Sequence, residues 1–407
     1  MSDFFLTIIG KGAIGLAIAR QLSRYYQNKE ILLLDKNPKF PSENQSSRNS
    51  GVIHAGIYYD KNVAPKKANT CVRGNNLLYQ YCKEHNIPFR NTGKLIISTN
   101  SEESKILEKL KSRSIENGLE GVEFLTEYEI SNFEKNITGN SALYVPSSGI
   151  IEPTSFLQSL HSLILKESVT SLDDVEVKDV KTDNENLEIT ISQSKEEYKF
   201  TSRYLINAAG LYSDIIAKKI NPEFDLKILP VRGEAAKYYI PNRTNSQDII
   251  VKRNVYPTPV RYQKEDGHIH TTLGVHLTPT LFASTNGEYE LDQFGEYKLG
   301  SMVTLGPTAT KLINGKAIGR EDYQEGLHHP SEFVRKVESF FPNIKDCKVS
   351  LHQAGIQAVL ANGDDFHYDF DKRHRNVINL VGICSPGLTS ALAIAQDIES
   401  MVKGEWN

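Results

Sequence analysis

The first 35 residues contain the feature that most restricts what this chain can fold into. Residues 4–9 are apolar and β-prone, and the glycine motif GKGAIG follows at residues 10–15. Helical spacing continues to residue 25, and a second buried-strand pattern at residues 30–34 ends at Asp35. A strand, a glycine turn, a helix and a second strand within about thirty residues predict a dinucleotide-binding unit, with an ordinary βα turn as the alternative.

Each part of this unit has a chemical reason. Gly10 permits a tight turn, Gly12 lets the backbone approach a pyrophosphate, and Gly15 allows close helix packing, while the amino end of the helix faces the phosphates. Asp35 lies 20 residues after Gly15, where its carboxylate can accept hydrogen bonds from a ribose. The expected cofactor contacts here are Gly10, Gly12, Ala13, Ile14, Gly15, Asp35 and Lys36.

Composition and charge narrow the class of partner. The net charge of -3 gives no basic surface for nucleic acid. No apolar stretch reaches the roughly 18 residues of a spanning helix, although peripheral membrane contact is compatible with the sequence. The four cysteines have no metal-ligand spacing and are typical of reduced thiols, which favours a cytoplasmic location, and no metal site is expected.

A second motif, SSRNSGVIHAGIYY at residues 46–59, indicates a flavin rather than a nicotinamide cofactor. Its small hydroxyl and amide side chains suit a further approach of the chain to a long cofactor, which a simple nicotinamide dehydrogenase does not need. This motif resembles the signature loop of the L-2-hydroxyglutarate dehydrogenase/oxidase family, within the glycine oxidase and D-amino acid oxidase superfamily. The resemblance implies contacts to noncovalent FAD from Ser47, Arg48, Asn49, Ser50 and Gly51.

Further segments are similar to that family in the expected order. They are NTGKLI at 91–96, GIIEP at 149–153, LINAAGLYSD at 205–214 and VGICSPGLTS at 381–390. The strand pattern at 175–180 resembles one that lies beside the adenine, with an ordinary sheet strand as the alternative. The resemblance adds these FAD contacts: Val177, Ala208, Ala209, Gly210, Gly355, Ser385, Pro386, Gly387, Leu388 and Thr389.

The positions of these motifs predict the architecture. Cofactor motifs at both ends and in the middle of the chain require a discontinuous α/β FAD-binding dinucleotide fold, expected at residues 1–80, 145–228 and 345–407. Residues 81–144 and 229–344 are expected to form a mixed-sheet α+β substrate domain. The active site would then lie between the two domains, against the flavin.

The resemblance implies FAD-dependent oxidation of a small 2-hydroxy acid, similar to L-2-hydroxyglutarate, with a quinone or oxygen as electron acceptor. Hydride leaves the substrate for the flavin and a base takes the hydroxyl proton, a role that suits histidine. His54 and His276 are the candidates for that base, with core hydrogen bonding as the alternative for each. Tyr256 could donate a hydrogen bond or only line the pocket, and Arg232 could contact substrate or only form a structural ion pair.

One position departs from the family pattern. Family members have an arginine in an AGxR segment that can bind a carboxylate through two hydrogen bonds, whereas this sequence has Ala354-Gly355-Ile356-Gln357. Either another cation, such as Arg261 or Lys252, replaces it, or the substrate differs. The alternatives are an amine or amino acid oxidase on the same fold, and a flavin-binding protein that has lost turnover.

Overall fold

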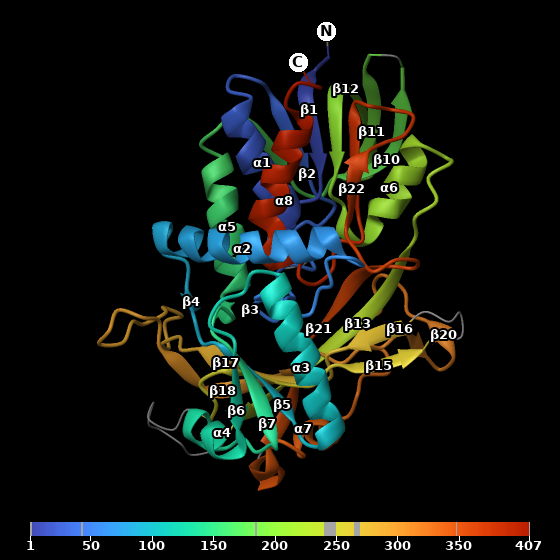
Figure 1. The fold of residues 1–407 in the computed structure, drawn as a ribbon. Helices are drawn as coiled ribbons and strands as arrows, with labels where there is room; N and C mark the ends of the chain where they lie inside the picture. The colour runs from blue at the N-terminus through green and yellow to red at the C-terminus, as the bar shows by residue number, and fades with distance from the viewer. Residues whose placement is uncertain are drawn as a thin grey trace.

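Two eight-stranded sheets, one in each lobe, form the frame of the protein (Figure 1). A computed structural model describes residues 2–41, 44–183, 185–239, 250–263, 269–346 and 348–406. Both chain ends lie on the lobe that contains the first sheet (Figure 1). The mixed α/β architecture predicted from the motifs is confirmed.

The first sheet has a parallel centre, in which β1 lies between β2 and β12. The sheet continues to β9 beyond β2, and β23 pairs in parallel with the end of β12, while β10, β11 and β22 add antiparallel pairs. Parallel strands covered on both faces are apolar along their length, as β1 and β2 are. The strands are β1 Phe4–Ile9, β2 Ile31–Leu34, β9 Val169–Leu172, β10 Glu176–Thr182, β11 Leu187–Gln193, β12 Glu196–Asn207, β22 His367–Phe370 and β23 Val377–Val381.

Helices cover this sheet and separate it from the second lobe. The helix α1 packs against α5 and α8, and α2 crosses the end of α8 between the two lobes (Figure 1). The buried alanines Ala391 and Ala395 of α8 allow this close packing. The helices are α1 Ala13–Tyr25, α2 Pro65–Glu84, α5 Pro153–Ile164, α6 Ser213–Ile220 and α8 Gly387–Val402, with a 3-10 turn η1 at Gly210–Tyr212.

The second sheet is mostly antiparallel, except that β14 and β5 run parallel. Its order is β21-β13-β18-β17-β14-β5-β7-β6. The strands are β5 Lys94–Ser98, β6 Glu123–Thr126, β7 Ser141–Val145, β13 Ile228–Tyr239, β14 Asn254–Pro257, β17 His276–Leu281, β18 Leu299–Gly306 and β21 Lys348–Leu360.

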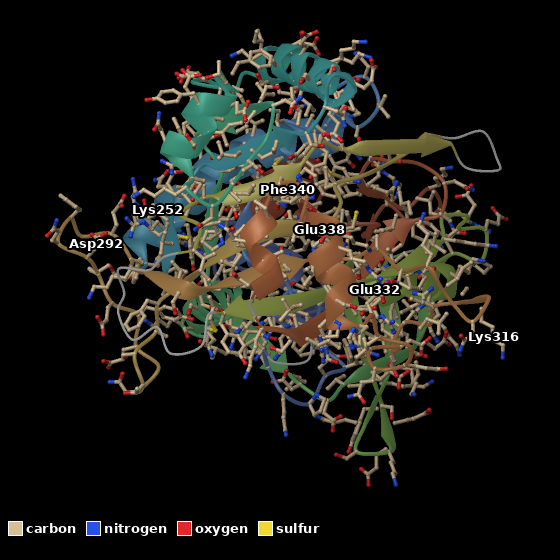
Figure 2. The ribbon with its side chains drawn as sticks, turned by 90° about the horizontal axis from the view of Figure 1, so that it is seen from below. Lys252, Asp292, Lys316, Glu332, Glu338 and Phe340 are labelled. Carbon is tan, nitrogen blue, oxygen red and sulfur yellow. The ribbon has the colours of Figure 1, made fainter. Side chains whose placement is uncertain are left out.

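Three helices and a second 3-10 turn accompany this sheet: α3 Ser101–Glu116, α4 Glu127–Phe133, α7 Pro330–Val337 and η2 Pro342–Asp346. Side chains of Asn100, Thr126 and His329 cap the amino ends of the three helices. Figure 2 views this lobe from below and labels Glu332 of α7, with Glu338 and Phe340 just after it.

Small strand pairs complete the fold. The strands β3 (Val52–Ile53) and β4 (Phe89–Arg90) both pair with β8 (Gly149–Ile151), next to the boundary between the lobes. Two separate hairpins are β15 Val260–Gln263 with β16 Ile269–Thr272, and β19 Leu312–Ile313 with β20 Lys316–Ala317.

The strand β21 changes where the last domain boundary falls. We expected residues 345–407 to belong to the FAD-binding domain, but β21 pairs with β13 from Lys348 to Leu360 within the second sheet. The place of β21 follows from its long antiparallel pairing with β13, which is more than a hundred residues earlier in the chain. It does not follow from the closeness of β21 in sequence to the carboxy-terminal motif. The division into two domains and its boundaries stay predictions.

Candidate active site

A cavity of about 850 Å³ lies between the two lobes. The glycine turn, the signature loop, the end of β12 and the carboxy-terminal motif line one side, and β13, β14, β17 and β21 line the other. The expected site residues that line it are Gly12, Ala13, Ile14, Arg48, Asn49, Ser50, His54, Ala208, Gly210, Tyr256, His276, Gly355, Gln357, Ser385, Pro386, Gly387 and Leu388.

The glycine turn has no room for side chains. Gly10 has a φ of +108°, and a Cβ there would lie 2.3 Å from the carbonyl oxygen of Ala208. A Cβ on Gly15 would lie 1.8 Å from the carbonyl oxygen of Gly10. The turn is therefore pressed between α1 and the end of β12, with Gly12 at the cavity surface.

The amino end of α1 is suited to a phosphate group. No acidic side chain lies in its first turn and Gly12 supplies no side-chain cap. The amide of Ala13 donates to Ser46 Oγ at 2.9 Å, which fixes the loop over the helix end. Free amides and the positive end of the helix dipole fit the diphosphate of a dinucleotide.

Asp35 and Lys36 do not line the cavity in this structure. Asp35 accepts hydrogen bonds from the amides of Lys11 at 2.6 Å and Asn37 at 2.9 Å, so it fixes the backbone after β2. Lys36 Nζ lies 3.0 Å from Glu321 Oε1 and 3.6 Å from the centre of the Tyr212 ring. Their expected contacts with the cofactor stay predictions.

The signature loop joins the two lobes. Arg48 Nη1 donates to the carbonyl oxygen of Ala354 on β21 at 3.2 Å, and its guanidinium lies over the Tyr323 ring. A Cβ on Gly355 would come within 3.2 Å of the Arg48 carbonyl oxygen, so the loop and β21 are in close contact. Ser47 Oγ instead donates to the Asn44 carbonyl oxygen, which stabilises the turn of the loop.

The carboxy-terminal motif begins α8 at the cavity. Residues 385–388 line the cavity, and the first turn of α8 contains no acidic side chain. Thr389 is fully buried, and its Oγ1 accepts a hydrogen bond from the amide of His54 at 3.1 Å. Thr389 therefore connects α8 to the signature loop. The backbone amides in the first turn of α8 lie at the end of the helix that borders the cavity.

Some expected contacts lie behind the cavity wall. Val177 is 5% exposed and packs in an apolar cluster with Ile9, Leu34 and Val175, so its expected contact with adenine stays a prediction. Gly10, Gly15, Gly51, Ala209, Thr389 and Arg232 are also absent from the lining.

Arg232 is enclosed by protein groups. Its side chain is 0% exposed and forms an ion pair with Glu234 at 2.8 Å. Its Nη atoms donate to the carbonyl oxygens of Asp322, Glu325 and Gly326 at 2.7–2.9 Å. This arrangement favours the structural alternative, because every donor of Arg232 that these contacts involve is directed to a protein group, and its catalytic role stays a prediction.

Four aromatic side chains form one wall of the cavity. The rings of Tyr256 on β14 and His276 on β17 stack with centres 3.7 Å apart, and Tyr58 lies 6.4 Å from Tyr256. His54 approaches from the signature loop, with its Nε2 3.3 Å from Ser385 Oγ. His54 Nδ1, Tyr58 Oη, Tyr256 Oη and His276 Nε2 are buried and have no hydrogen-bond partner among the described residues.

Both histidines are held neutral. Burial is the larger cause and the charge of Lys94 the second, and together they lower the pKa of His276 to about 3. The same two causes hold the pKa of His54 well below its ordinary value of 6.5. Each imidazole is therefore neutral near neutral pH and has one ring nitrogen with a free lone pair.

Lys94 is a further residue of this site that was not expected from the sequence, although it lies in the motif NTGKLI at residues 91–96. A lysine inside an otherwise apolar strand pattern, KLIIS, is the signal that could have identified it. Lys94 is 1% exposed, and its Nζ lies 3.8 Å from the centre of the Tyr256 ring. Burial lowers its pKa to about 7.

The cations proposed to replace the missing arginine do not take that position. Lys252 lines a separate, smaller hollow with Arg90 and Asp292, and the side chain of Arg261 lies outside the described side chains. Gln357 does line the main cavity, on β21 opposite Val231 of β13.

Within the described part of the chain, no group of three His, Cys, Asp or Glu side chains could hold a metal ion. No described helix combines the length and apolar character that a membrane crossing requires. Cys71, Cys82 and Cys384 are free thiols.

The fold and cavity are those of a dinucleotide-binding protein with a site between two sheets. The family described as FAD dependent oxidoreductase matches residues 6–401, and the chain belongs to this family. It is therefore an FAD-dependent oxidoreductase that acts on a CH-OH or CH-NH group. The glycine turn and the two helix amino ends fit that cofactor.

Named relatives agree with this assignment. The chain is 30% identical to an L-2-hydroxyglutarate dehydrogenase from Indibacter alkaliphilus, over 96% of this chain and 97% of the relative. It is 29% identical to a glycerol 3-phosphate dehydrogenase from Caloramator mitchellensis, over 98% and 74%. The FAD-bound L-alpha-glycerophosphate oxidase from Mycoplasma pneumoniae has the same fold, with a TM-score of 0.79 at 23% identity over 99% and 95% of the two chains.

Proposed function

We propose that this protein oxidises a small 2-hydroxy acid, similar to L-2-hydroxyglutarate, to the corresponding 2-oxo acid. The four unpaired polar atoms on the aromatic wall carry this proposal. Unpaired buried polar groups cost free energy, and a polar substrate would supply the partners that they lack. The similarity to L-2-hydroxyglutarate dehydrogenases over nearly the whole chain supports the substrate class.

The oxidation removes a proton from the substrate hydroxyl and a hydride from the adjoining carbon. Bound FAD supplies the acceptor for the hydride. We assign the proton to Nε2 of His276. Its Nδ1 lies 3.3 Å from the Gly274 carbonyl oxygen, which can only accept, so Nδ1 carries the proton and Nε2 has a free lone pair. The phenol groups of Tyr58 and Tyr256 are available to donate hydrogen bonds to substrate oxygens.

His54 has a different position and a different proposed role. It belongs to the signature loop and lies beside Ser385, and its carbonyl oxygen accepts a hydrogen bond from Asn75 at 2.9 Å. His54 would therefore orient the substrate beside the cofactor. Noncovalent FAD, a quinone or oxygen as acceptor, and a cytoplasmic location stay predictions. Acid precipitation tests the first, because noncovalent flavin would remain in the supernatant.

The decisive experiment is an anaerobic titration of the purified holoprotein with L-2-hydroxyglutarate, followed by its D isomer. Loss of the visible absorption of oxidised flavin, with formation of 2-oxoglutarate, is the expected result. A flavin band that no hydroxy acid reduces would overturn the proposal while leaving the family assignment in place.

A second candidate is oxidation of glycerol 3-phosphate. The relative from Caloramator mitchellensis favours it, because that similarity also extends over 98% of this chain. Glycerol 3-phosphate also combines a hydroxyl group with an anionic group. The same titration separates the two candidates, and amino acids in the panel, with ammonia as the product measured, test an amino acid oxidase.

A further inference from the structure

Lys94 is the first residue of β5 and is enclosed on all sides. Its backbone pairs with Asn254 of β14 and Val145 of β7, which fixes the start of its side chain between two strands. Its Nζ lies 3.8 Å from the centre of the Tyr256 ring and 5.3 Å from that of Tyr58. The ammonium group is thus held beside two aromatic rings that line the cavity, whereas Lys94 itself lies behind this lining.

This ammonium group has no counter-ion among the described residues. No described Asp or Glu forms an ion pair with Lys94, and the Cys71 thiol is the one group whose charge would favour the ammonium form. That thiol is itself buried, which raises its pKa and keeps it neutral. Cation–π contacts with Tyr58 and Tyr256 offset only part of the cost of removing an ammonium from water.

The other titratable groups around Lys94 carry no negative charge either. His54 and His276 have lowered pKa values and are neutral, and burial raises the pKa of both Tyr58 and Tyr256, so these phenols stay protonated. Within this cluster Lys94 is therefore the one side chain that carries a positive charge, which it does below its pKa of about 7. Elsewhere the cavity is also lined by Arg48, Lys67 and Arg113 and by Asp60, Asp364 and Asp365. The charge in the cluster is stabilised by an anion that enters the cavity.

We propose that Lys94 is a specificity-determining residue, whose buried ammonium beside Tyr58 and Tyr256 selects substrates with a carboxylate or another small anionic group. This proposal deepens the proposed function, on which it rests for the position of the substrate. Lys94 acts through its charge, while Tyr58 Oη and Tyr256 Oη remain free to donate hydrogen bonds to the same anion. Lys94 adds to the positive charge of Arg48, Lys67 and Arg113, which line the cavity where Gln357 brings no charge.

Anion binding would also affect the proposed base. Burial and, as the second cause, the positive charge of Lys94 lower the pKa of His276. A bound anion would offset that charge and raise the pKa of His276 towards its ordinary value. His276 would then accept a proton more readily when an anionic substrate is present than when a neutral molecule occupies the cavity.

The experiment measures ligand binding to the oxidised holoprotein through the change in flavin absorption. Malonate and inorganic phosphate are the anionic probes, and malonamide is the neutral probe of similar size. In Lys94→Met the dissociation constant for malonate should rise by about 30-fold or more, the loss expected when one partner of a desolvated charge pair is removed. The dissociation constant for malonamide should stay the same, and Lys94→Arg should retain most of the preference for malonate.

Lys252→Met is the matched control. Lys252 is an exposed lysine at the edge of the second lobe, where Figure 2 labels it, and it does not line the main cavity. Its replacement should leave both dissociation constants unchanged. Lys94→Gln serves as a second neutral variant if Lys94→Met does not retain FAD.

The outcomes separate this proposal from the proposed function. Equal malonate binding in the wild type and both neutral Lys94 variants would overturn the role of Lys94, even if L-2-hydroxyglutarate reduces the flavin. Loss of malonate binding in those variants supports the role, even if no hydroxy acid reduces the flavin. Tighter binding of phosphate than of malonate by the wild type would indicate that the anionic group of the substrate is a phosphate.

Discussion

The imidazole ring of His276 stacks on the phenol ring of Tyr256, with ring centres 3.7 Å apart and planes 14° from parallel. The two residues come from β14 and β17, which are antiparallel neighbours in the second sheet. The stack fixes the plane of the imidazole, while the Gly274 carbonyl oxygen fixes its tautomer. A base that is fixed in orientation and tautomer does not have to be reorganised when it accepts a proton.

The first prediction concerns this base. His276→Gln should slow flavin reduction by the hydroxy acid by about 100-fold to 10,000-fold, the usual contribution of general base catalysis. Stopped-flow absorbance under anaerobic conditions measures the rate. His329→Gln is the control, because His329 caps α7 and does not line the cavity. An unchanged rate in His276→Gln would show that another group accepts the proton, and His54 would then be the next residue to test.

The second prediction tests the glycine turn. Gly10→Ala should abolish stoichiometric FAD binding, because the new Cβ would lie 2.3 Å from the Ala208 carbonyl oxygen in a turn that faces the cavity. Gly118→Ala is a matched control, since Gly118 also has a positive φ, +75°, but has open space around its Cβ position. Gly118→Ala should cost about 1 kcal/mol of stability and leave FAD content unchanged. Full FAD content in Gly10→Ala would contradict the proposed contact.

The third prediction follows from the buried charge of Lys94. Its pKa falls from an ordinary value of 10.5 to about 7 in the folded protein, so the unfolded chain binds more protons between these pH values. Lys94 therefore does not reduce the free energy of unfolding above about pH 10.5. As the pH falls from there towards about 7, the free energy of unfolding decreases. Lys94→Met should stabilise the ligand-free holoprotein most at pH 7 and below, and this gain should shrink as the pH rises.

Thermal unfolding of the wild type and Lys94→Met over this pH range measures the difference. The slope should be about 1.4 kcal/mol per pH unit at most, because one proton is involved. A difference in stability that does not change with pH would show that Lys94 does not titrate in this window. A Lys94→Met variant that is less stable at every pH would indicate a structural role for the lysine.

The parts of this protein that the sequence predicted well are local ones. The strand at Phe4–Ile9, the glycine turn and the strand before Asp35 are determined by contiguous residues, and the structure confirms them. The cavity also includes most of the motif residues, because each motif is a strand end or helix start that faces the same gap.

The parts that the sequence did not predict depend on pairing over long distances. Lys94 meets Tyr256 only because β5 lies beside β14, which is 160 residues later in the chain. Arg232 looked like a candidate for substrate binding, but the carbonyl oxygens that enclose it come from residues 322–326, a segment with no pattern that indicates its position. Charge pairing of this kind becomes visible only when the sheets are assembled.

The last prediction concerns Gln357, where the family pattern has an arginine. Gln357 lines the same cavity as Tyr58 and Tyr256, so a charge placed there should act on the same bound anion. Gln357→Arg should tighten malonate binding by on the order of 10-fold, and Gln357→Glu should weaken it by a similar factor, because a single charge interaction in a partly desolvated site contributes about 1–2 kcal/mol.

The two substitutions introduce opposite charges, so a general disturbance of the cavity would weaken malonate binding in both, whereas a charge effect has opposite signs. Malonamide binding should change little in either variant, which separates charge from shape. If both variants weaken malonate equally, Gln357 contributes through packing, and the selection of anions does not depend on charge at this position. If Gln357→Arg also restores malonate binding to the Lys94→Met protein, the cavity requires a positive charge but does not require it at one fixed position.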